Sequence, residues 1–156
     1  MSDAGNDRAQ IADLIYRYAE LIDAGDYAGL GELLGRAAFG GPKTPTVSGA
    51  DAIAKLFGIT TKRFGDGTPK TRHLVLNLIV EVDGDTAAAR STFCVVQATD
   101  RVALAPIVVG RYYDTFARDT SVQDDGGWHF TERLADVEMV GDVSDHLLID
   151  PAAFDR

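Results

Sequence analysis

The stretch TRHLVLNLIVEVDGDTAAARS, from Thr71 to Ser91, decides the fold of this 156-residue chain. Apolar residues stand at every second position from Leu74 to Val82, which is the period of a β-strand. The pair Asp83-Gly84 follows, and such a pair is typical of a two-residue hairpin turn. The stretch therefore predicts a β-hairpin, with strands over about 72–82 and 85–98.

The register of this hairpin brings four polar or reactive side chains to one face. With Asp83-Gly84 as the turn, Asn77 lies opposite Arg90, and His73 lies opposite Cys94. In a curved sheet this would be the concave face, so we predict that all four residues line a pocket. Two simpler readings stay open: Asn77 and Arg90 form a cross-strand pair that holds the sheet, and Cys94 is a small buried apolar residue.

Helices are predicted before the hairpin. Apolar residues at three- and four-residue spacing begin at Ile11 and indicate a helix that ends at Gly25. Asp26 is a candidate N-cap for a second helix through about Leu34. A third helix should follow Ser48 or Gly49 and include residues 50–64.

Strands are predicted after the hairpin, over about 102–117 and 128–140, with a polar turn at 118–127 between them. Helices followed by an antiparallel meander indicate an α+β fold, with the helices packed on one face of a strongly curved sheet. We expect a single domain over residues 11–147, a flexible N-terminal arm over 1–10, and a C-terminal tail over 148–156.

Composition argues against several classes of function. A net charge of −9 without a basic cluster is unlike a nucleic-acid-binding protein, and it disfavours anionic membranes. The sequence shows no membrane-length apolar run, signal peptide, phosphate-binding loop or metal-spaced Cys/His set. The single cysteine excludes an intrachain disulfide. We therefore expect a cytoplasmic protein without a metal or another cofactor.

Four segments in order carry a family resemblance: IADLIYRYAELIDAGDYAGLGELL (11–34), TRHLVLNLIVEVDGDTAAARS (71–91), VVGRYYDTF (108–116) and GGWHFTERLADVEMVGDVSDHL (126–147). Together they resemble the SnoaL-like branch of the nuclear transport factor 2-like superfamily. The resemblance implies a cone-shaped fold with a pocket at its wide end, and a homodimer formed through the outer face of the sheet. The superfamily includes scytalone dehydratase, ketosteroid isomerase, polyketide cyclases and non-catalytic members, so the fold alone does not give the activity.

The resemblance also implies roles for three residues. The dehydratase pairs an aspartate at the end of the first helix with a histidine in the first long strand, and Asp23 and His73 match those two positions. His73 would then transfer a proton and Asp23 would orient it. Tyr18 matches the helix tyrosine of the isomerase, which implies a hydrogen-bond donor for an oxyanion. Tyr16, on the helix flank near Asp23, and Tyr113 are further candidate pocket residues.

The chain departs from both relatives. The second pocket histidine of the dehydratase has no match in STFCVVQATD (91–100), and the base of the isomerase has none in AAFGGP (37–42). Arg111 and Arg133 are expected at the sheet surface, paired with acids. His146 is expected to fasten the tail, although a tail can also cover a pocket.

Together these features predict a cofactor-independent lyase or isomerase acting on a mostly apolar, cyclic carbonyl compound. Two alternatives stay open: a non-catalytic ligand-binding or assembly module, and an accessory subunit like the small subunit of ring-hydroxylating dioxygenases.

Overall fold

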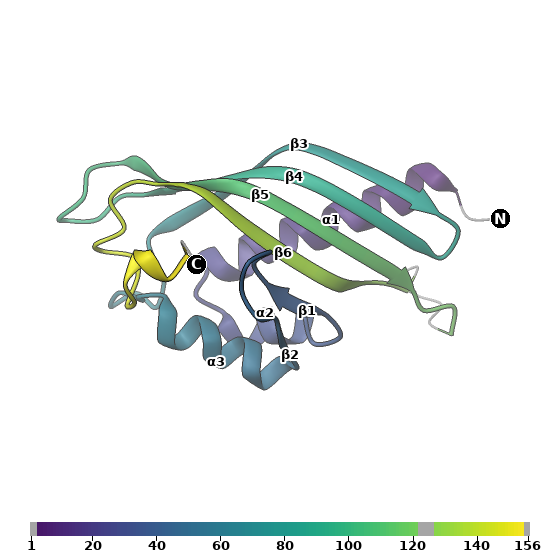
Figure 1. Ribbon diagram of the computed structural model, residues 1–156, viewed down its shortest axis with the longest axis horizontal. Coiled ribbons are helices and arrows are strands. Elements are labelled where there is room, and N and C mark those ends of the chain that lie inside the picture. Colours follow the sequence, from purple (N-terminus) through teal and green to yellow (C-terminus); the bar gives the residue numbers. More distant parts are fainter. Residues whose placement is uncertain (1–2, 122–126, 155–156) are drawn as a thin grey trace.

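A computed structural model describes residues 3–121 and 127–154 of the chain (Figure 1). In chain order its elements are α1 (Ala4–Asp23), α2 (Tyr27–Leu33), β1 (Ala38–Gly40), β2 (Val47–Ser48), α3 (Ala50–Thr60), β3 (Thr71–Asp83), β4 (Thr86–Gln97), β5 (Ala105–Arg118), β6 (Trp128–Val140) and the 3-10 turn η1 (Pro151–Phe154).

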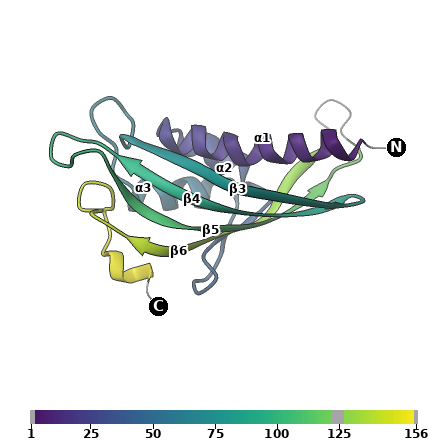
Figure 2. The same ribbon diagram turned by 90° about the horizontal axis from the view of Figure 1, so that it is seen from above.

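The six strands form one sheet in the order β2-β1-β6-β5-β4-β3. All neighbouring pairs are antiparallel except β1 and β6, which run parallel. The sheet curves around the helices without closing into a barrel, and Figure 2 shows α1 lying along its inner side. The predicted α+β fold, a cone of helices on a curved and mainly antiparallel sheet, is confirmed.

Helix α1 begins at Ala4, so it includes most of the segment expected to be a flexible arm. The Asp3 carboxylate caps it by accepting a hydrogen bond from the Gly5 N–H (3.0 Å). One turn later, buried Asp7 accepts two hydrogen bonds from Arg118 (2.9 and 3.2 Å) and one from the Trp128 indole (3.1 Å). These contacts tie the first turns of α1 to the ends of β5 and β6.

The predicted helix boundaries near residue 25 are confirmed. Gly25 has φ of 73°, a left-handed conformation that ends α1 with little strain for glycine. Asp26 caps α2 by accepting a hydrogen bond from the Gly29 N–H (2.8 Å). The sharp turn directs α2 and α3 to one end of the sheet, as Figure 1 shows.

The core lies between the helices and the concave face of the sheet. The buried stripe of α1 contains Ile11, Ile15, Tyr18 and Ile22. The inward residues of the central strands include Phe93, Val95, Tyr112, Phe116 and Phe130. Burial of this apolar surface is the main stabilising contribution to the fold.

The hairpin turn lies one residue later than predicted. Asp83 pairs with Thr86, so the turn residues are Gly84 and Asp85. Gly84 has φ of 60°, which suits glycine. The predicted partners on β4 are therefore displaced.

A β-bulge also interrupts β3 at Asn77. The pairing shifts between Leu76 and Ile79, so that two residues of β3 oppose Ser91 alone. Asn77 has φ of 54°, in a left-handed region where asparagine is found more often than most residues.

The bulge reverses the parity of the inward-facing residues along β3. His73 and Val75 lie on the inner face before the bulge, whereas Leu78, Val80 and Val82 pack against the core after it. A regular strand would have placed those last three side chains outside, so the sequence assignment was wrong for the second half of β3.

A second register shift changes the assignment of Arg133. The β5–β6 pairing shifts between Thr115 and Phe116, and the extra residue lies in β6. Phe130 and Arg133 are therefore both buried, although they have opposite parity in the sequence. The expectation of a surface Arg133 was wrong, whereas Arg111 does form an exposed ion pair with Glu138 (2.8 Å).

Within residues 3–121 and 127–154, no helix combines the length and apolar character needed to cross a membrane. The predicted cytoplasmic location stays a prediction. Part of the polar turn predicted at 118–127 and the end of the predicted tail lie outside the described residues.

Candidate active site

Asp23 and His73 meet at one end of the cone, as predicted. His73 Nδ1 lies 2.7 Å from Asp23 Oδ1, and the His73 backbone N–H donates to Asp23 Oδ2 (2.9 Å). The Thr71 hydroxyl donates a third hydrogen bond, to Oδ1 (2.9 Å). These partners stabilise a carboxylate that the C-terminal end of the α1 dipole disfavours.

The geometry fixes how the His73 imidazole is used. An ionised carboxylate only accepts hydrogen bonds, so the Nδ1 atom facing Asp23 carries a proton. In the neutral ring Nε2 is then the basic nitrogen. The side chains of His73 and Asp23 are only 6% and 12% exposed, so the pair is largely shielded from water.

A second histidine, His146, lies close enough to His73 and Asp23 for their charges to interact. It comes from the tail after β6. Burial, with the His73 charge as a further cause, lowers the His146 pKa to about 4, so this ring is neutral at pH 7. Its Nδ1 atom is buried without a hydrogen-bond partner among the described residues.

The tail around His146 is tied down by contacts with three other segments. Asp145 pairs with Lys62, and its carbonyl accepts a hydrogen bond from Gln97 Nε2 (3.1 Å). The His146 carbonyl accepts from the Lys62 N–H (2.8 Å), and the Leu148 N–H donates to the Thr60 carbonyl (2.9 Å). These contacts confirm that the segment with His146 is fastened to the domain, between the end of α3 and the end of β4.

Aromatic rings and a buried arginine lie at the centre of the cone. The Tyr18 ring lies 5.8 Å from the Tyr112 ring, and the Arg133 guanidinium lies within 4.1 Å of both ring centroids. Burial raises the Tyr112 pKa to about 12 and the Tyr18 pKa well above its usual value. Both hydroxyls therefore stay protonated and can donate hydrogen bonds.

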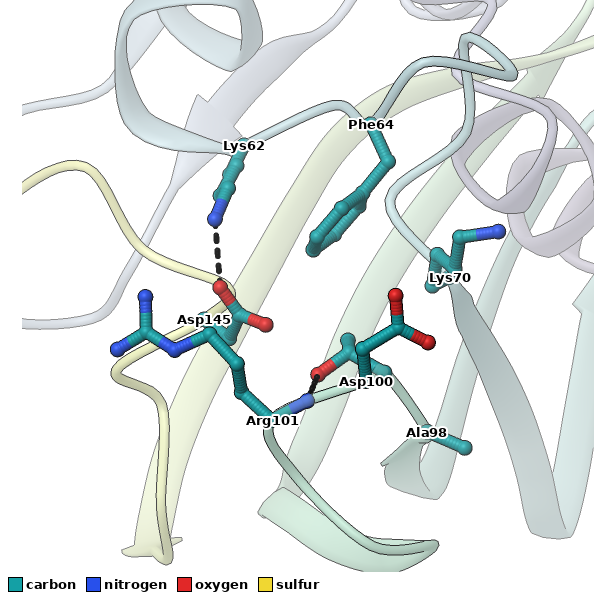
Figure 3. A pocket seen from close by; sticks show the side chains of 8 residues that line it. Lys62, Phe64, Lys70, Ala98, Asp100, Arg101 and Asp145 are labelled. Atoms are coloured by element: carbon teal, nitrogen blue, oxygen red, sulfur yellow. Dashed lines mark hydrogen bonds and ion pairs between the residues drawn. The ribbon is translucent and has the colours of Figure 1, made fainter.

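Figure 3 shows a cleft of about 430 Å³ at the same end of the sheet as His73. Its walls come from the loop after α3, the β4–β5 loop and the tail, and they include Lys62, Phe64, Lys70, Arg101 and Asp145. A shallower hollow of about 240 Å³ is lined mainly by exposed residues of β4 and β5. Neither hollow is lined by His73 or Asp23, whereas Asp145 of the tail lines the cleft and the adjacent His146 lies near the pair.

The structure places none of the five predicted pocket-lining residues in the interior, although Arg90 and Tyr113 line the shallower hollow. Asn77 lies in the bulge and is exposed, while Arg90 points outward and pairs with Glu81 at 3.6 Å. The three others also lie away from the interior: Cys94 on the outer face of β4, and Tyr16 and Tyr113 among the exposed apolar residues. The bulge explains the first three, because it reverses which residues of β3 and β4 share the inner face with His73, whereas the displaced turn changes only which residues are paired.

Four residues of the interior were missed or misplaced in the sequence, and one of them is Tyr112, which is buried where Tyr113 was predicted to line the pocket. Thr71 stands two positions before His73 on the same strand face, a spacing that could have identified it. His146 carries no local signal, because its position depends on the path of the tail. The burial of Arg133 depends on the β6 bulge. Among the residues that the structure describes, no group of three or more His, Cys, Asp or Glu side chains could hold a metal ion.

A family model described as a SnoaL-like domain matches residues 3–134. The chain belongs to this SnoaL-like family. No curated protein sequence matches the chain significantly.

Solved structures share the fold. An NTF2-like protein with a cystatin-like fold from Novosphingobium aromaticivorans is 27% identical, with a TM-score of 0.67, over 86% of this chain and 90% of that one. A putative scytalone dehydratase from the same organism is 20% identical, with a TM-score of 0.65 and 87% of each chain covered. ActVI-ORFA from Streptomyces coelicolor is 16% identical, with a TM-score of 0.65, over 84% of this chain and 96% of that one. The last two proteins are 20% identical to this chain or less, so their similarity shows the fold alone.

Proposed function

We propose that this SnoaL-like protein is a cofactor-independent lyase or isomerase that moves a proton on a largely apolar, cyclic carbonyl compound. The observation that carries the proposal is the bond between Asp23 and His73 Nδ1, which leaves Nε2 as a base in a shielded site. A shielded site strengthens electrostatic interactions with a developing charge.

In this mechanism His73 Nε2 takes a proton from the carbon next to the substrate carbonyl. Asp23 stabilises the imidazolium that forms, and the protonated hydroxyls of Tyr18 and Tyr112 donate hydrogen bonds to the enolate oxygen. Return of the proton to another carbon completes an isomerisation. Its transfer to a leaving hydroxyl group, which departs as water, completes a lyase reaction.

Access to His73 requires movement of the tail, because the side chains of the pair are covered. Asp145 lines the cleft of Figure 3, and the next residue, His146, lies close to His73 and Asp23. Displacement of residues 142–148 would connect the cleft with the pair. When the segment returns over a bound substrate, His146, neutral and with its Nδ1 atom unbonded to the described residues, would meet the substrate beside His73.

The test measures proton exchange at a carbon next to a carbonyl, since the natural substrate is not identified. NMR follows deuterium uptake by 1-indanone in D2O near neutral pH, with and without protein. We expect His73→Asn to lower the protein-catalysed rate by about 10²-fold or more, the range of general base catalysis. Asp23→Asn should also lower it strongly, whereas the exposed control Asp13→Asn on α1 should not. Undiminished catalysis by His73→Asn would contradict the proposal.

A non-catalytic ligand-binding role is the second candidate, favoured by the covering of His73 and by the absence of His73 from the lining of either hollow. In that case the wild-type protein would bind 1-indanone without accelerating its exchange.

We further propose a homodimer through the outer face of the sheet. An apolar row crosses this face at paired positions Leu74, Cys94, Val109 and Met139. Leu74 and Met139 are exposed in the single chain, together with Leu76 and Ile79. Such an apolar surface is typical of a protein–protein interface.

A further inference from the structure

Arg133 lies at the centre of the concave face with its side chain 0% exposed. Its strand neighbours are Asp114 on β5 and Phe39 on β1. The site proposed above gives no role to this guanidinium. It is the largest of the side chains that are fully buried within the described residues.

The Arg133 guanidinium contacts aromatic rings, but its N–H groups lack well-formed hydrogen bonds. The rings of Tyr112 and Tyr18 lie with their centroids 3.7 and 4.1 Å from the guanidinium carbon, which are cation–π distances. The N–H groups lie in the guanidinium plane and need acceptors along its edges. Nε, Nη1 and Nη2 have no hydrogen-bond partner of good geometry among the described residues, and the Tyr112 hydroxyl beside Arg133 offers at most a weak one.

Asp114 is a poor partner for this arginine. Its Oδ2 atom lies 3.7 Å from Nη1, beyond hydrogen-bond length, and neither carboxylate oxygen has a hydrogen-bond partner among the described residues. Ser91 Oγ, on the adjacent strand β4, is also buried without such a partner. One arginine, one aspartate and one serine thus hold unused hydrogen-bonding capacity on the same concave surface.

This arrangement is unfavourable for stability alone. A buried charge that lacks hydrogen bonds is costly, and well-packed apolar residues often replace buried ion pairs without loss of stability. A bound group with two oxygens in one plane would match two parallel N–H groups of the guanidinium. The unsatisfied edges therefore favour a ligand over a purely structural role.

We propose that Arg133 recognises a carboxylate on the ligand, so that the substrate is a cyclic or aromatic carboxylic acid whose ring packs against Tyr18 and Tyr112. This refinement rests on the proposed function, because Arg133 would bind a carboxylate on the same substrate whose carbonyl end reacts at His73. Tyr112 connects the two regions, since charges of both Arg133 and Asp23 act on its hydroxyl.

The charge balance of the cluster is compatible with such a ligand. Burial raises the Asp114 pKa to about 6, and a neighbouring carboxylate would raise it further. Asp114 can then take up a proton and need not oppose the incoming anion.

The experiment compares the binding of two probes of almost the same shape, 2-naphthoate and its neutral analogue 2-naphthamide, by calorimetry at one pH and salt concentration. We expect the wild type to bind the carboxylate about 10-fold or more tightly, as a charge-assisted bidentate bond implies. Arg133→Gln should remove this preference. Arg133→Lys should reduce it, because lysine keeps the charge but not the paired N–H geometry.

His73→Asn separates this inference from the proposed function. It should keep the preference for 2-naphthoate while it loses 1-indanone exchange. Equal affinity of the wild type for the two probes, or binding of neither, would overturn the role of Arg133 and leave proton transfer by His73 standing. An undiminished preference in Arg133→Gln would overturn it as well. If Arg133→Gln does not fold, the ratio of the affinities for 2-naphthoate and 2-naphthamide, measured in the wild type and in Arg133→Lys, still tests the role of Arg133.

Discussion

Asp23 holds His73 by two separate atoms, the backbone nitrogen and the imidazole Nδ1, across 50 residues of sequence. The backbone bond fixes the start of β3 against the end of α1, and the side-chain bond fixes the orientation of the ring. The same carboxylate thus serves the fold and the proposed chemistry.

Removal of the Asp23 carboxylate should destabilise the protein measurably. Asp23→Ala loses three hydrogen bonds and leaves donors of Thr71 and His73 in a largely buried position. We expect the free energy of unfolding in urea to fall by about 2–4 kcal/mol. The control Asp13→Ala, on the exposed side of the same helix, should change it by less than about 0.5 kcal/mol. Equal effects of the two variants would show that the contacts of Asp23 add little to stability.

His146 should make the protein less stable in mild acid. Its pKa is lowered to about 4 by burial, below the usual value near 6.5, so unfolding takes up a proton between these pH values. Stability contributed by the neutral ring is therefore present above pH 6.5 and is lost as pH falls toward 4.

A comparison with His146→Gln isolates this contribution. The raised Asp114 pKa acts with the opposite sign, because the folded state then binds the proton more tightly and loses stability as pH rises through about 6. Both variants carry Asp114, so its effect cancels in the difference. The wild type should lose up to about 1.4 kcal/mol per pH unit more than His146→Gln over the window. If the stabilities of the wild type and His146→Gln changed with pH in parallel, His146 would take up its proton in the folded protein as well, and the prediction would be wrong.

Loosening the tail should expose the site without unfolding the domain. Asp145→Ala removes the ion pair with Lys62 that fastens the segment next to His146. We expect the Leu148 amide, which donates to Thr60, to exchange with solvent faster by on the order of 10-fold, while core strand amides are unchanged. Asp66→Ala, which removes the exposed ion pair with Lys70, is the matched control. Faster exchange across all strands would indicate global destabilisation instead.

The outer sheet face should mediate dimerisation. Leu76→Glu places a charge on the exposed apolar surface of β3, and we expect light scattering to show half the wild-type mass. Ile59→Glu makes the same change at an exposed position of α3 and should leave the mass unchanged. A monomeric wild type would refute the proposed assembly.

The elements were predictable from sequence because their signals are local, whereas the Asp23–His73 pair was implied by the family resemblance. Helix periodicity, the caps at Gly25 and Asp26, and the strand motif around His73 each depend on neighbouring residues. Once the family resemblance was taken into account, the pair followed from matched positions.

The rest of the site depends on features without a local signal. A single extra residue in β3, and another in β6, changes which later side chains face inward, so alternation misplaced Asn77, Arg90 and Arg133. Alternation assumes a regular ladder, and sequence alone does not show where the ladder is interrupted. His146 reaches His73 only because the tail folds back between α3 and β4.

The bulge at Asn77 also has a genetic consequence. Loss of that single codon would leave Leu76 and Leu78 on the faces they already occupy, since two residues now share one place opposite Ser91. The hairpin would survive with continuous pairing but with less bend. A straighter β3 would carry His73 away from the end of α1, so the deletion should abolish the proposed proton transfer while the hairpin still forms.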